Sequence, residues 1–241
     1  MYSEQLRRYS FVTALLISCC VRANASVTVF TDRNLWLTAT SGVNTIGFEG
    51  IAGPGGIVQY NNPGDTLTIG SVSFQGQDHA SSSNDMEVNN SISPNWGSGA
   101  VLEGPAGNGV GQHLIATLPV GIFAVGSDIM LYDGNAGSSV ADTITVKLSI
   151  DSTTYPALTL SGFSSRGFIG FVSDTQIGSI TFFPASDPGP HLILDNFSTG
   201  GQAAVDPAPE AATMILCGGG LLLIGLVRRH RNSDAKPPRG A

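Results

Sequence analysis

Short runs in which apolar and polar residues alternate dominate the chain between Ser26 and about Thr199. The runs are rich in Val, Ile, Thr and Phe, and Gly, Pro, Asn and Asp separate them. Alternation places apolar side chains on one face of a half-buried strand, so each run predicts a β-strand. The predicted strands cover residues 26–30, 45–48, 67–74, 100–103, 112–118, 123–131, 142–150, 155–160, 168–172, 179–183 and 192–197. Many short, closely spaced strands predict an all-β fold, an antiparallel β-sandwich of jelly-roll type.

One stretch departs from the alternation and predicts a short N-terminal helix. It is TDRNLWLTAT, residues 31–40. Thr31 or Asp32 can cap the first turn, because a side-chain oxygen at that position accepts hydrogen bonds from the free N–H groups of the turn. Leu35, Trp36 and Ala39 fall on one side of about two helical turns.

The longest gap between predicted strands is residues 75–99, QGQDHASSSNDMEVNNSISPNWGSG. Ser and Asn cluster in it, so we expect a long loop at one end of the sandwich, and loops of this length are usually functional or mobile. Trp96 is the one large aromatic residue in it. Its flat indole could stack on a sugar ring in a ligand-binding role, and the favoured alternative is that it packs as a plug over the sandwich edge.

Charge is distributed unevenly along the chain. Between Ser26 and Glu210 there are three basic residues, Arg33, Lys147 and Arg166, against sixteen acidic ones, a formal net charge of −13. Nucleic-acid binding depends on Lys and Arg that neutralise phosphates, so this body excludes nucleic acid as a partner. An acidic surface of this kind keeps a protein soluble, and it can also attract cations.

The three cysteines lie outside this body. Cys19 and Cys20 are in the first apolar stretch and Cys217 is in the last. The sandwich therefore has no disulfide and no zinc–thiolate site. A domain of about 175 residues buries enough apolar surface to fold without either.

Residues 1–25 have the pattern of a secretory signal peptide. Arg7 and Arg8 precede an apolar run, and the small residues of ANA, 23–25, predict that signal peptidase cleaves after Ala25. LISC, residues 16–19, resembles the lipobox of bacterial lipoproteins. The alternative is therefore lipidation at Cys19.

A second apolar segment lies near the other end, at residues 211–227. These 17 uncharged residues would span about 25 Å as a helix, slightly less than the roughly 30 Å of a bilayer's hydrocarbon core. A basic cluster follows, which the positive-inside rule places in the cytoplasm, and it consists of Arg228, Arg229 and Arg231. The segment predicts a C-terminal transmembrane helix.

Pro209-Glu210, the apolar run and the Arg-Arg-His-Arg cluster together resemble the PEP-CTERM sorting signal of exported bacterial proteins. The resemblance implies an exosortase-type membrane enzyme as partner, recognition of Pro209 and Glu210, and a transient anchor. It divides the end of the chain into a linker (201–208), a sorting signal (209–231) and a cytoplasmic tail (232–241). Ala211 stands where the family has a second proline, so a permanently tail-anchored protein is the alternative.

The body, residues 26–200, resembles the ectodomain of many PEP-CTERM proteins. The order of VFTDRNLWL, IGFEG, SVSFQG, FAVGSDI, GFIGFVSDTQIGSITF and LILDNFSTG carries the likeness. That ectodomain looks like the jelly rolls of carbohydrate-binding modules, in which a Glu after an early strand and an Asp in the last strand often hold a structural calcium. Glu49 and Asp195 match those places. The alternative is that both are ordinary strand-end acceptors.

Signals for catalysis are few. His79, His113 and His191 lack metal-ligand spacing, and the chain has no Gly-x-Ser-x-Gly motif. Paired carboxylates for glycoside cleavage come from distant strands and leave no local spacing. We therefore expect no catalytic residues and no cofactor besides the calcium.

The expected protein is a non-enzymatic cell-surface or matrix protein, associated with exopolysaccharide and biofilm and capable of carbohydrate binding. The alternative from another class is a secreted polysaccharide-active enzyme.

Overall fold

The computed structural model describes residues 25–77, 86–91, 99–105, 112–133, 138–150, 153–154, 158–162, 165–184 and 190–203. These residues belong to one compact unit, Met1–Ala203. The predictions that concern Cys19, Trp96, Pro209, Glu210 and the span 211–227 lie outside the described residues. No helix within the described residues is long and apolar enough to cross a membrane.

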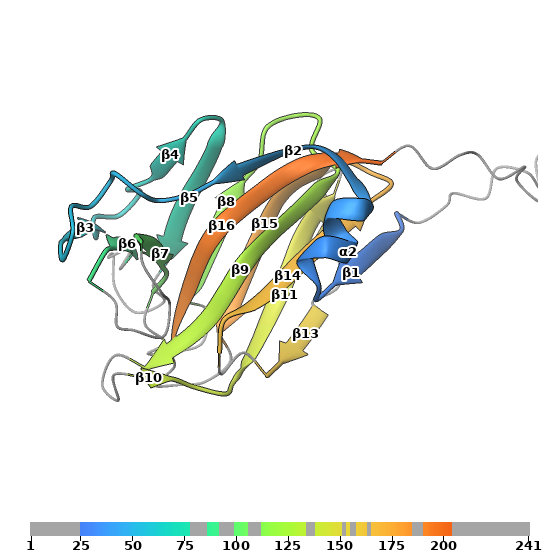
Figure 1. Ribbon diagram of the computed structural model, residues 1–241. Coiled ribbons are helices and arrows are strands. Elements are labelled where there is room, and N and C mark those ends of the chain that lie inside the picture. Colours follow the sequence, from blue (N-terminus) through green and yellow to red (C-terminus); the bar gives the residue numbers. More distant parts are fainter. Residues whose placement is uncertain are drawn as a thin grey trace, which may run out of the picture. The chain divides into compact units, whose positions relative to one another are not determined.

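Two antiparallel sheets form the layers of the fold (Figure 1). In the nine-stranded sheet the order is β1 (Val27–Phe30), β14 (Gly167–Ser173), β9 (Ala124–Asp133), β16 (His191–Gln202), β7 (Val101–Glu103), β6 (Met86–Asn89) and β3 (Ile57–Tyr60). Beside this path, β10 (Ser138–Ser139) pairs with β9, and β2 (Thr40–Ile46) pairs with β16.

The seven-stranded sheet has the order β12 (Thr153–Thr154), β11 (Thr143–Ile150), β15 (Ile177–Pro184), β8 (His113–Thr117), β5 (Val72–Gln77) and β4 (Leu67–Ile69). In addition, β13 (Leu158–Ser161) pairs with β11. Every strand pair within the two sheets is antiparallel, which confirms the predicted all-β sandwich.

The core lies between the sheets and follows from the alternation in the sequence. Every second residue of β11 is buried, from Ile144 to Ile150. Three aromatic rings form a chain through the core: Phe74 lies 5.6 Å from Phe48 and 5.1 Å from Phe197 between ring centroids, in edge-to-face geometry. Burial of apolar area at about 25 cal/mol per Å² is the main stabilising contribution in such a core.

Several predicted strands differ from the observed ones. The single strand predicted over 67–74 is the hairpin β4–β5, because Gly70, at φ +60°, and Ser71 form a two-residue turn. β6 lies inside the segment predicted as one long loop, and β3 was not predicted. Both have only four residues, too few for alternation to stand out among the surrounding Ser, Asn and Gly.

The predicted helix is present as α2, Arg33–Thr38. Asp32 is the N-cap, and its carboxylate accepts hydrogen bonds from the backbone N–H groups of Asn34 and Leu35 at 2.7 and 3.0 Å. The buried side of α2 is narrower than predicted. Trp36 is completely buried, whereas the side chain of Leu35 is 62% exposed.

A cross-strand pair of glycines makes room for Trp36 on the nine-stranded sheet. Gly126 of β9 and Gly170 of β14 are register partners. A Cβ atom at Gly126 would lie 2.7 Å from Cζ of Phe168 and 3.2 Å from Cε2 of Trp36, closer than side chains can pack. The indole Nε1 donates a hydrogen bond to the Phe171 carbonyl at 3.2 Å. Helix α2 therefore docks on the side of the sheet that faces away from the core (Figure 1).

β16 changes partners along one of its edges. Its first half pairs with β7, its second half pairs with β2, and β9 lies along the opposite edge. Between the two halves, the register with β9 shifts from Asp195 to Ser198. Asn196 in this bulge has φ +47°, a left-handed conformation that Asn tolerates better than most residues.

Candidate functional site

The candidate site is the side of the nine-stranded sheet that faces away from the core, here called the outer face. Register places Asp128 opposite Asp195, Met130 opposite Ile193, and Tyr132 opposite His191. Because Ile129, Leu131, Leu192 and Leu194 belong to the core, these alternate residues point outward. The same side continues across β7, β6 and β3 through the register partners Glu103, Glu87 and Gln59.

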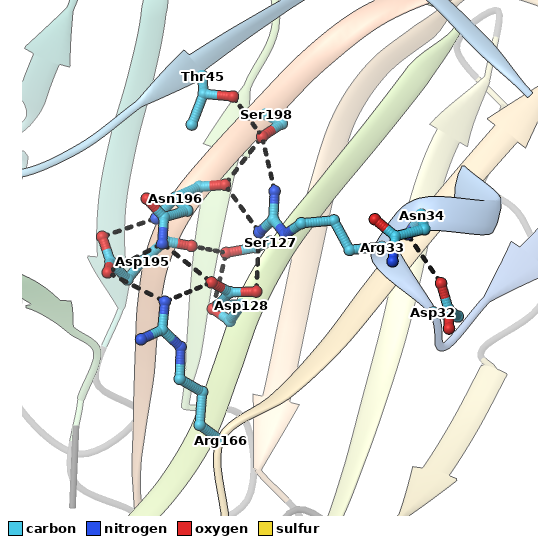
Figure 2. A network of polar contacts seen from close by, with 10 residues as sticks. All are labelled: Asp32, Arg33, Asn34, Thr45, Ser127, Asp128, Arg166, Asp195, Asn196 and Ser198. Atoms are coloured by element: carbon cyan, nitrogen blue, oxygen red, sulfur yellow. Dashed lines mark hydrogen bonds and ion pairs between the residues drawn. The ribbon is translucent and has the colours of Figure 1, made fainter. Parts of the chain in front are cut away.

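The first group on this face is the arginine cluster, composed of Arg33, Asp128, Arg166, Asp195 and Asn196 (Figure 2). Nη2 of Arg33 donates to Oδ1 of Asp128 at 2.7 Å, and Nη2 of Arg166 donates to Oδ2 at 2.6 Å. Asp128 thus binds one arginine with each carboxylate oxygen. Arg33 comes from α2 and Arg166 directly precedes β14, so the pair ties both segments to the central strand β9.

Asn196 completes the arginine cluster from the bulge of β16. Its Nδ2 donates to Oδ2 of Asp128 at 2.9 Å and to Oδ2 of Asp195 at 3.2 Å. Its backbone N–H donates to Oδ1 of Asp195 at 2.7 Å. The left-handed backbone of Asn196 is what allows one residue to reach both carboxylates, so the bulge shapes this part of the face.

Hydroxyl groups fix the bulge from both sides. The buried Ser127 hydroxyl lies 2.9 Å from the carbonyl oxygens of Asp128 and Asp195. The Ser198 hydroxyl donates to the Asn196 carbonyl at 2.9 Å and lies 2.9 Å from the Thr45 hydroxyl of β2. These contacts connect β9, β16 and β2 (Figure 2). The polar groups of the bulge are therefore held in place within the fold.

The ionisation of Asp128 follows from these contacts. Burial by itself would raise the pKa of Asp128, but hydrogen bonds from the two arginines and Asn196 outweigh it and hold the pKa below its usual value. Asp128 is thus charged throughout the neutral range. The side chains of Arg33 and Arg166 remain 29% and 41% exposed, so both guanidinium groups reach solvent.

The second group is the glutamate cluster, composed of Gln59, Glu87, Asn89, Glu103 and His191. Glu103 is buried, and its Oε1 lies 2.7 Å from Nδ1 of His191. The Asn89 amide Nδ2 bridges the two acids, at 3.1 Å from Oε2 of Glu103 and 3.0 Å from Oε1 of Glu87. On the other side, Gln59 donates to Oε2 of Glu87 at 3.4 Å.

Glu87 and Glu103 differ in their surroundings although they are register partners. Burial raises the pKa of Glu87, and the charge of Glu103 raises it further, against smaller opposite effects of Gln59, Asn89 and His191. Glu87 therefore takes up a proton more readily than an ordinary glutamate does.

An apolar strip separates the two clusters. Val101, Met130 and Ile193 pack together, at most 1% exposed, with Tyr132 against them. Ile193 is register partner of Glu103 and lies two residues before Asp195 on β16, so the clusters are roughly 7 Å apart along the strand. The strip itself is buried, so the groups of this face that solvent can reach are the partly exposed members of the two clusters, among them Arg33, Arg166 and His191.

Glu49 and Asp195, the predicted calcium ligands, have different neighbours. The Glu49 carboxylate lies against the backbone of Gly47 and Gly99. Asp195 accepts hydrogen bonds from Asn196 and lies 3.7 Å from Nη2 of Arg166, so a cation there would compete with a guanidinium group. Within the described residues, no group of three or more His, Cys, Asp or Glu side chains could hold a metal ion. The calcium site stays a prediction.

Apart from Asp195, the residues of both clusters were not predicted as site residues. Their partners are distant in the sequence, with Arg33 and Asp128 95 residues apart, so no local motif marks them. One signal was present: the body has only three basic residues, and two of them meet at Asp128. An arginine binds a carboxylate through strong charge-assisted hydrogen bonds, so the few arginines of so acidic a body mark where paired carboxylates can lie.

Comparison with known proteins identifies no family. No protein-family model matches the chain, and no curated protein matches it. Among solved structures, the family 11 carbohydrate-binding module of the cellulosomal cellulase Lic26A-Cel5E of Clostridium thermocellum is similar at 14% identity and a TM-score of 0.32, covering 69% of this chain and 99% of that chain.

A second similar structure is the family 11 carbohydrate-binding module from Clostridium thermocellum in complex with a β-1,3-1,4-mixed-linked tetrasaccharide. It is 13% identical, with a TM-score of 0.29, over 75% of this chain and 98% of that chain. These values are too low to support a conclusion about fold or function. The description of this protein as an antiparallel sandwich rests on its own strand pairing.

Proposed function

We propose that this chain is an exported cell-surface or extracellular-matrix protein that binds a neutral polysaccharide on its outer face without cleaving it. One observation carries the proposal: two clusters of prearranged hydrogen-bonding groups lie on one side of the sheet, and each has partly exposed members, among them Arg33, Arg166 and His191. Sugars present hydroxyl groups along their length, so a face with several fixed donors and acceptors suits them.

Hydrogen bonding on the outer face favours hydroxyl groups as the ligand's polar groups. The half-buried carboxylate of Glu87 accepts hydrogen bonds, and Arg166, whose side chain is 41% exposed, donates them. A hydroxyl group does both, so one sugar residue can engage an acceptor and a donor together. Because the clusters are fixed by contacts within the fold, little ordering of side chains is needed on binding.

Charge argues against an anionic ligand. The outer face carries four carboxylates, those of Glu87, Glu103, Asp128 and Asp195, and the two arginines are already bound to Asp128. The body around it has a formal net charge of −13. A polymer of uronic acids or sulfated sugars would be repelled by this charge, whereas a neutral polymer would not.

Retention of the full-length chain on immobilised polysaccharides tests this proposal. A neutral glucan and a uronic-acid polymer of similar length, compared at low and moderate salt, are suitable probes. We expect the neutral polymer to retain the protein at both salt concentrations, and the acidic polymer to retain none. Absence of retention by a range of neutral polymers would refute the binding function.

Export and sorting form the second part of the proposal. Support comes from the signal-peptide pattern at 1–25 and from the order of Pro209-Glu210, apolar run and basic cluster. An exosortase-type enzyme would then remove the end of the chain after export. Mass spectrometry of the mature C-terminus tests this step. Loss of residues 228–241 is the expected result, and an intact C-terminus would identify a permanently anchored protein instead.

A hydrolytic function is the second candidate, and the glutamate cluster is the observation that favours it. Glu87 has a raised pKa and stands beside a second carboxylate, as the acid and base of glycosidases do. Against this, Glu103 is buried and bound to His191 and Asn89, which leaves its oxygens little access to a substrate. Release of reducing ends from a bound polysaccharide, abolished by Glu87→Gln, would establish hydrolysis. We expect no release.

A further inference from the structure

The glutamate cluster lies at the joint between β7 and β16, the shortest pairing along the path from β1 to β3 in the nine-stranded sheet. β7 and β16 share two register pairs, Ile193 with Glu103 and Leu194 with Leu102. One additional backbone bond runs from the Gly104 N–H to the Leu192 carbonyl at 2.7 Å. β6 pairs with β7, and β3 pairs with β6. The three strands β3, β6 and β7, here called the sheet edge, therefore reach the central strands of their sheet through this short joint.

Among the described residues, a polar side-chain pair spans the joint beside the apolar contact of Val101 with Ile193. Glu103 is in β7 and His191 is the first residue of β16, and their side chains meet at 2.7 Å. The Glu103 side chain is 7% exposed and that of His191 is 26% exposed. When His191 is protonated, the two charges attract each other more strongly here than at the surface because water screens them less, while their desolvation opposes this gain. Asn89 extends the connection from Glu103 to β6.

The strength of this contact depends on the His191 proton. A protonated imidazole places a positive charge beside the buried Glu103 carboxylate, whereas a neutral imidazole leaves that carboxylate with hydrogen bonds alone. Among the described residues, the titratable groups beside His191 are Glu103 from β7, Glu87 from β6 and Tyr132 from β9. From β3, the neutral Gln59 reaches Glu87. Glu103 and Glu87 carry negative charge when ionised, and a proton on His191 offsets part of it.

We propose that the His191–Glu103 pair is a pH-sensitive clasp, which holds the sheet edge to β16 and loosens it when His191 loses its proton. Because Glu87 belongs to the sheet edge, the clasp also sets the position of half of the outer face. The influence of the clasp on polysaccharide binding rests on the function proposed above. Its effect on the sheet edge is independent of that function.

Hydrogen exchange of backbone amides in the full-length chain tests the clasp, with rates corrected for the intrinsic pH dependence of exchange. Amides of β6 and β7 should lose protection by about tenfold or more between roughly pH 5.5 and 8, because local opening reports the contacts that hold an element. Amides of β11 and β15 in the other sheet should keep their protection.

Two histidine variants separate the clasp from general effects. His191→Gln should give low protection of β6 and β7 at every pH, because glutamine carries no charge to lose. His113→Gln is the matched control: His113 lies on the seven-stranded sheet, 5.0 Å from the Phe183 ring between centroids, and this variant should keep the pH response of the wild type. The clasp is refuted by an equal pH response in His191→Gln and wild type, or by no response in the wild type.

Glu87 is a second titratable group of the glutamate cluster, so Glu87→Gln tests whether the pH response comes from Glu87 instead of His191. If His191 is the responsible group, this variant keeps the pH response above about pH 6. Loss of the response in Glu87→Gln alone would contradict the assignment to His191. Polysaccharide retention is measured on the same samples. A protein that shows the exchange response but retains no polymer would refute the binding function and leave the clasp in place.

Discussion

The outer faces of the two sheets differ although the strands that form them look alike in sequence. On the seven-stranded sheet, β11 alternates between buried and half-buried residues along its length, and its outward Lys147 lies over the Phe183 ring at 4.4 Å. On the nine-stranded sheet, the first eight residues of β9 are buried on both sides. One outer face is thus an ordinary solvated surface and the other is partly covered and charged.

Two features produce this difference. Trp36 anchors α2 on the glycine pair of β9 and β14, which covers one part of the face. The arginine and glutamate clusters occupy the next part, where three carboxylates are buried and each has a polar partner. Burying charge is costly unless each group is paired, so these contacts are what keeps the carboxylates on this face. The predictions below test whether the two faces differ as described.

Trp36→Ala should have the largest effect. It removes a completely buried side chain and a hydrogen bond to Phe171, so we expect a loss of about 3–5 kcal/mol in the free energy of unfolding. The matched change on the other outer face is Phe183→Ala, which removes a half-buried ring and should cost about 1–2 kcal/mol. Urea denaturation measures both. Equal losses would show that α2 is not anchored as described.

Asp128→Asn should have the next largest effect, a loss of about 2–3 kcal/mol in the free energy of unfolding, because it leaves two arginines without their charged partner. The loss stays moderate because the Arg166 side chain is partly in water. The folded-state pKa of Asp128 is lowered, so its contribution is complete above the unfolded value of about 3.8 and is lost as pH falls through the folded value. The deficit of the variant should therefore persist at about pH 5 and vanish in stronger acid. Asp142→Asn, just before the other sheet's β11, is the control and should cost less than Asp128→Asn at about pH 5 and above.

Gly126→Ala should cost about 1–3 kcal/mol, since the new methyl group would overlap Phe168 and displace Trp36. Gly178→Ala in β15 provides the comparison, because a Cβ there meets its nearest atom, the Ser149 carbonyl oxygen, at an ordinary 3.6 Å. We expect that change to stay within about 0.5 kcal/mol. Thermal unfolding of the two variants, measured side by side, tests this difference. Similar melting temperatures would show that the glycine pair is not needed to accommodate Trp36.

Glu87→Gln should have the smallest effect and the opposite sign. A raised folded-state pKa means that the stability associated with Glu87 is complete below its unfolded value of about 4.5 and declines as pH rises through the folded value. The variant should gain less than about 1 kcal/mol near pH 7 and nothing near pH 4. Chemical denaturation at both pH values measures this. Destabilisation near pH 7 would show that ionised Glu87 supports the fold.

The sequence predicted the layers of the fold better than it predicted the site. Alternation identified β11 to within one residue, and Asp32 was a predicted cap of α2. β3 and β6 were missed because four residues among turn formers carry little pattern. The arginine cluster was missed for a different reason. Its residues come from α2, β9, the start of β14 and a bulge in β16, and only the fold brings them together.

The binding role of the outer face is the central claim, and one pair of affinities tests it most directly. Dissociation constants of a neutral glucan are compared for Arg166→Ala, on the outer face of the nine-stranded sheet, and Lys147→Ala, on that of the seven-stranded sheet. Each variant removes one positive charge from a partly exposed side chain. The account predicts binding about tenfold weaker for Arg166→Ala and unchanged for Lys147→Ala, because a hydrogen bond to a charged group contributes about 1.5 kcal/mol or more. Equal affinities for the two variants, or a loss confined to Lys147→Ala, would contradict it.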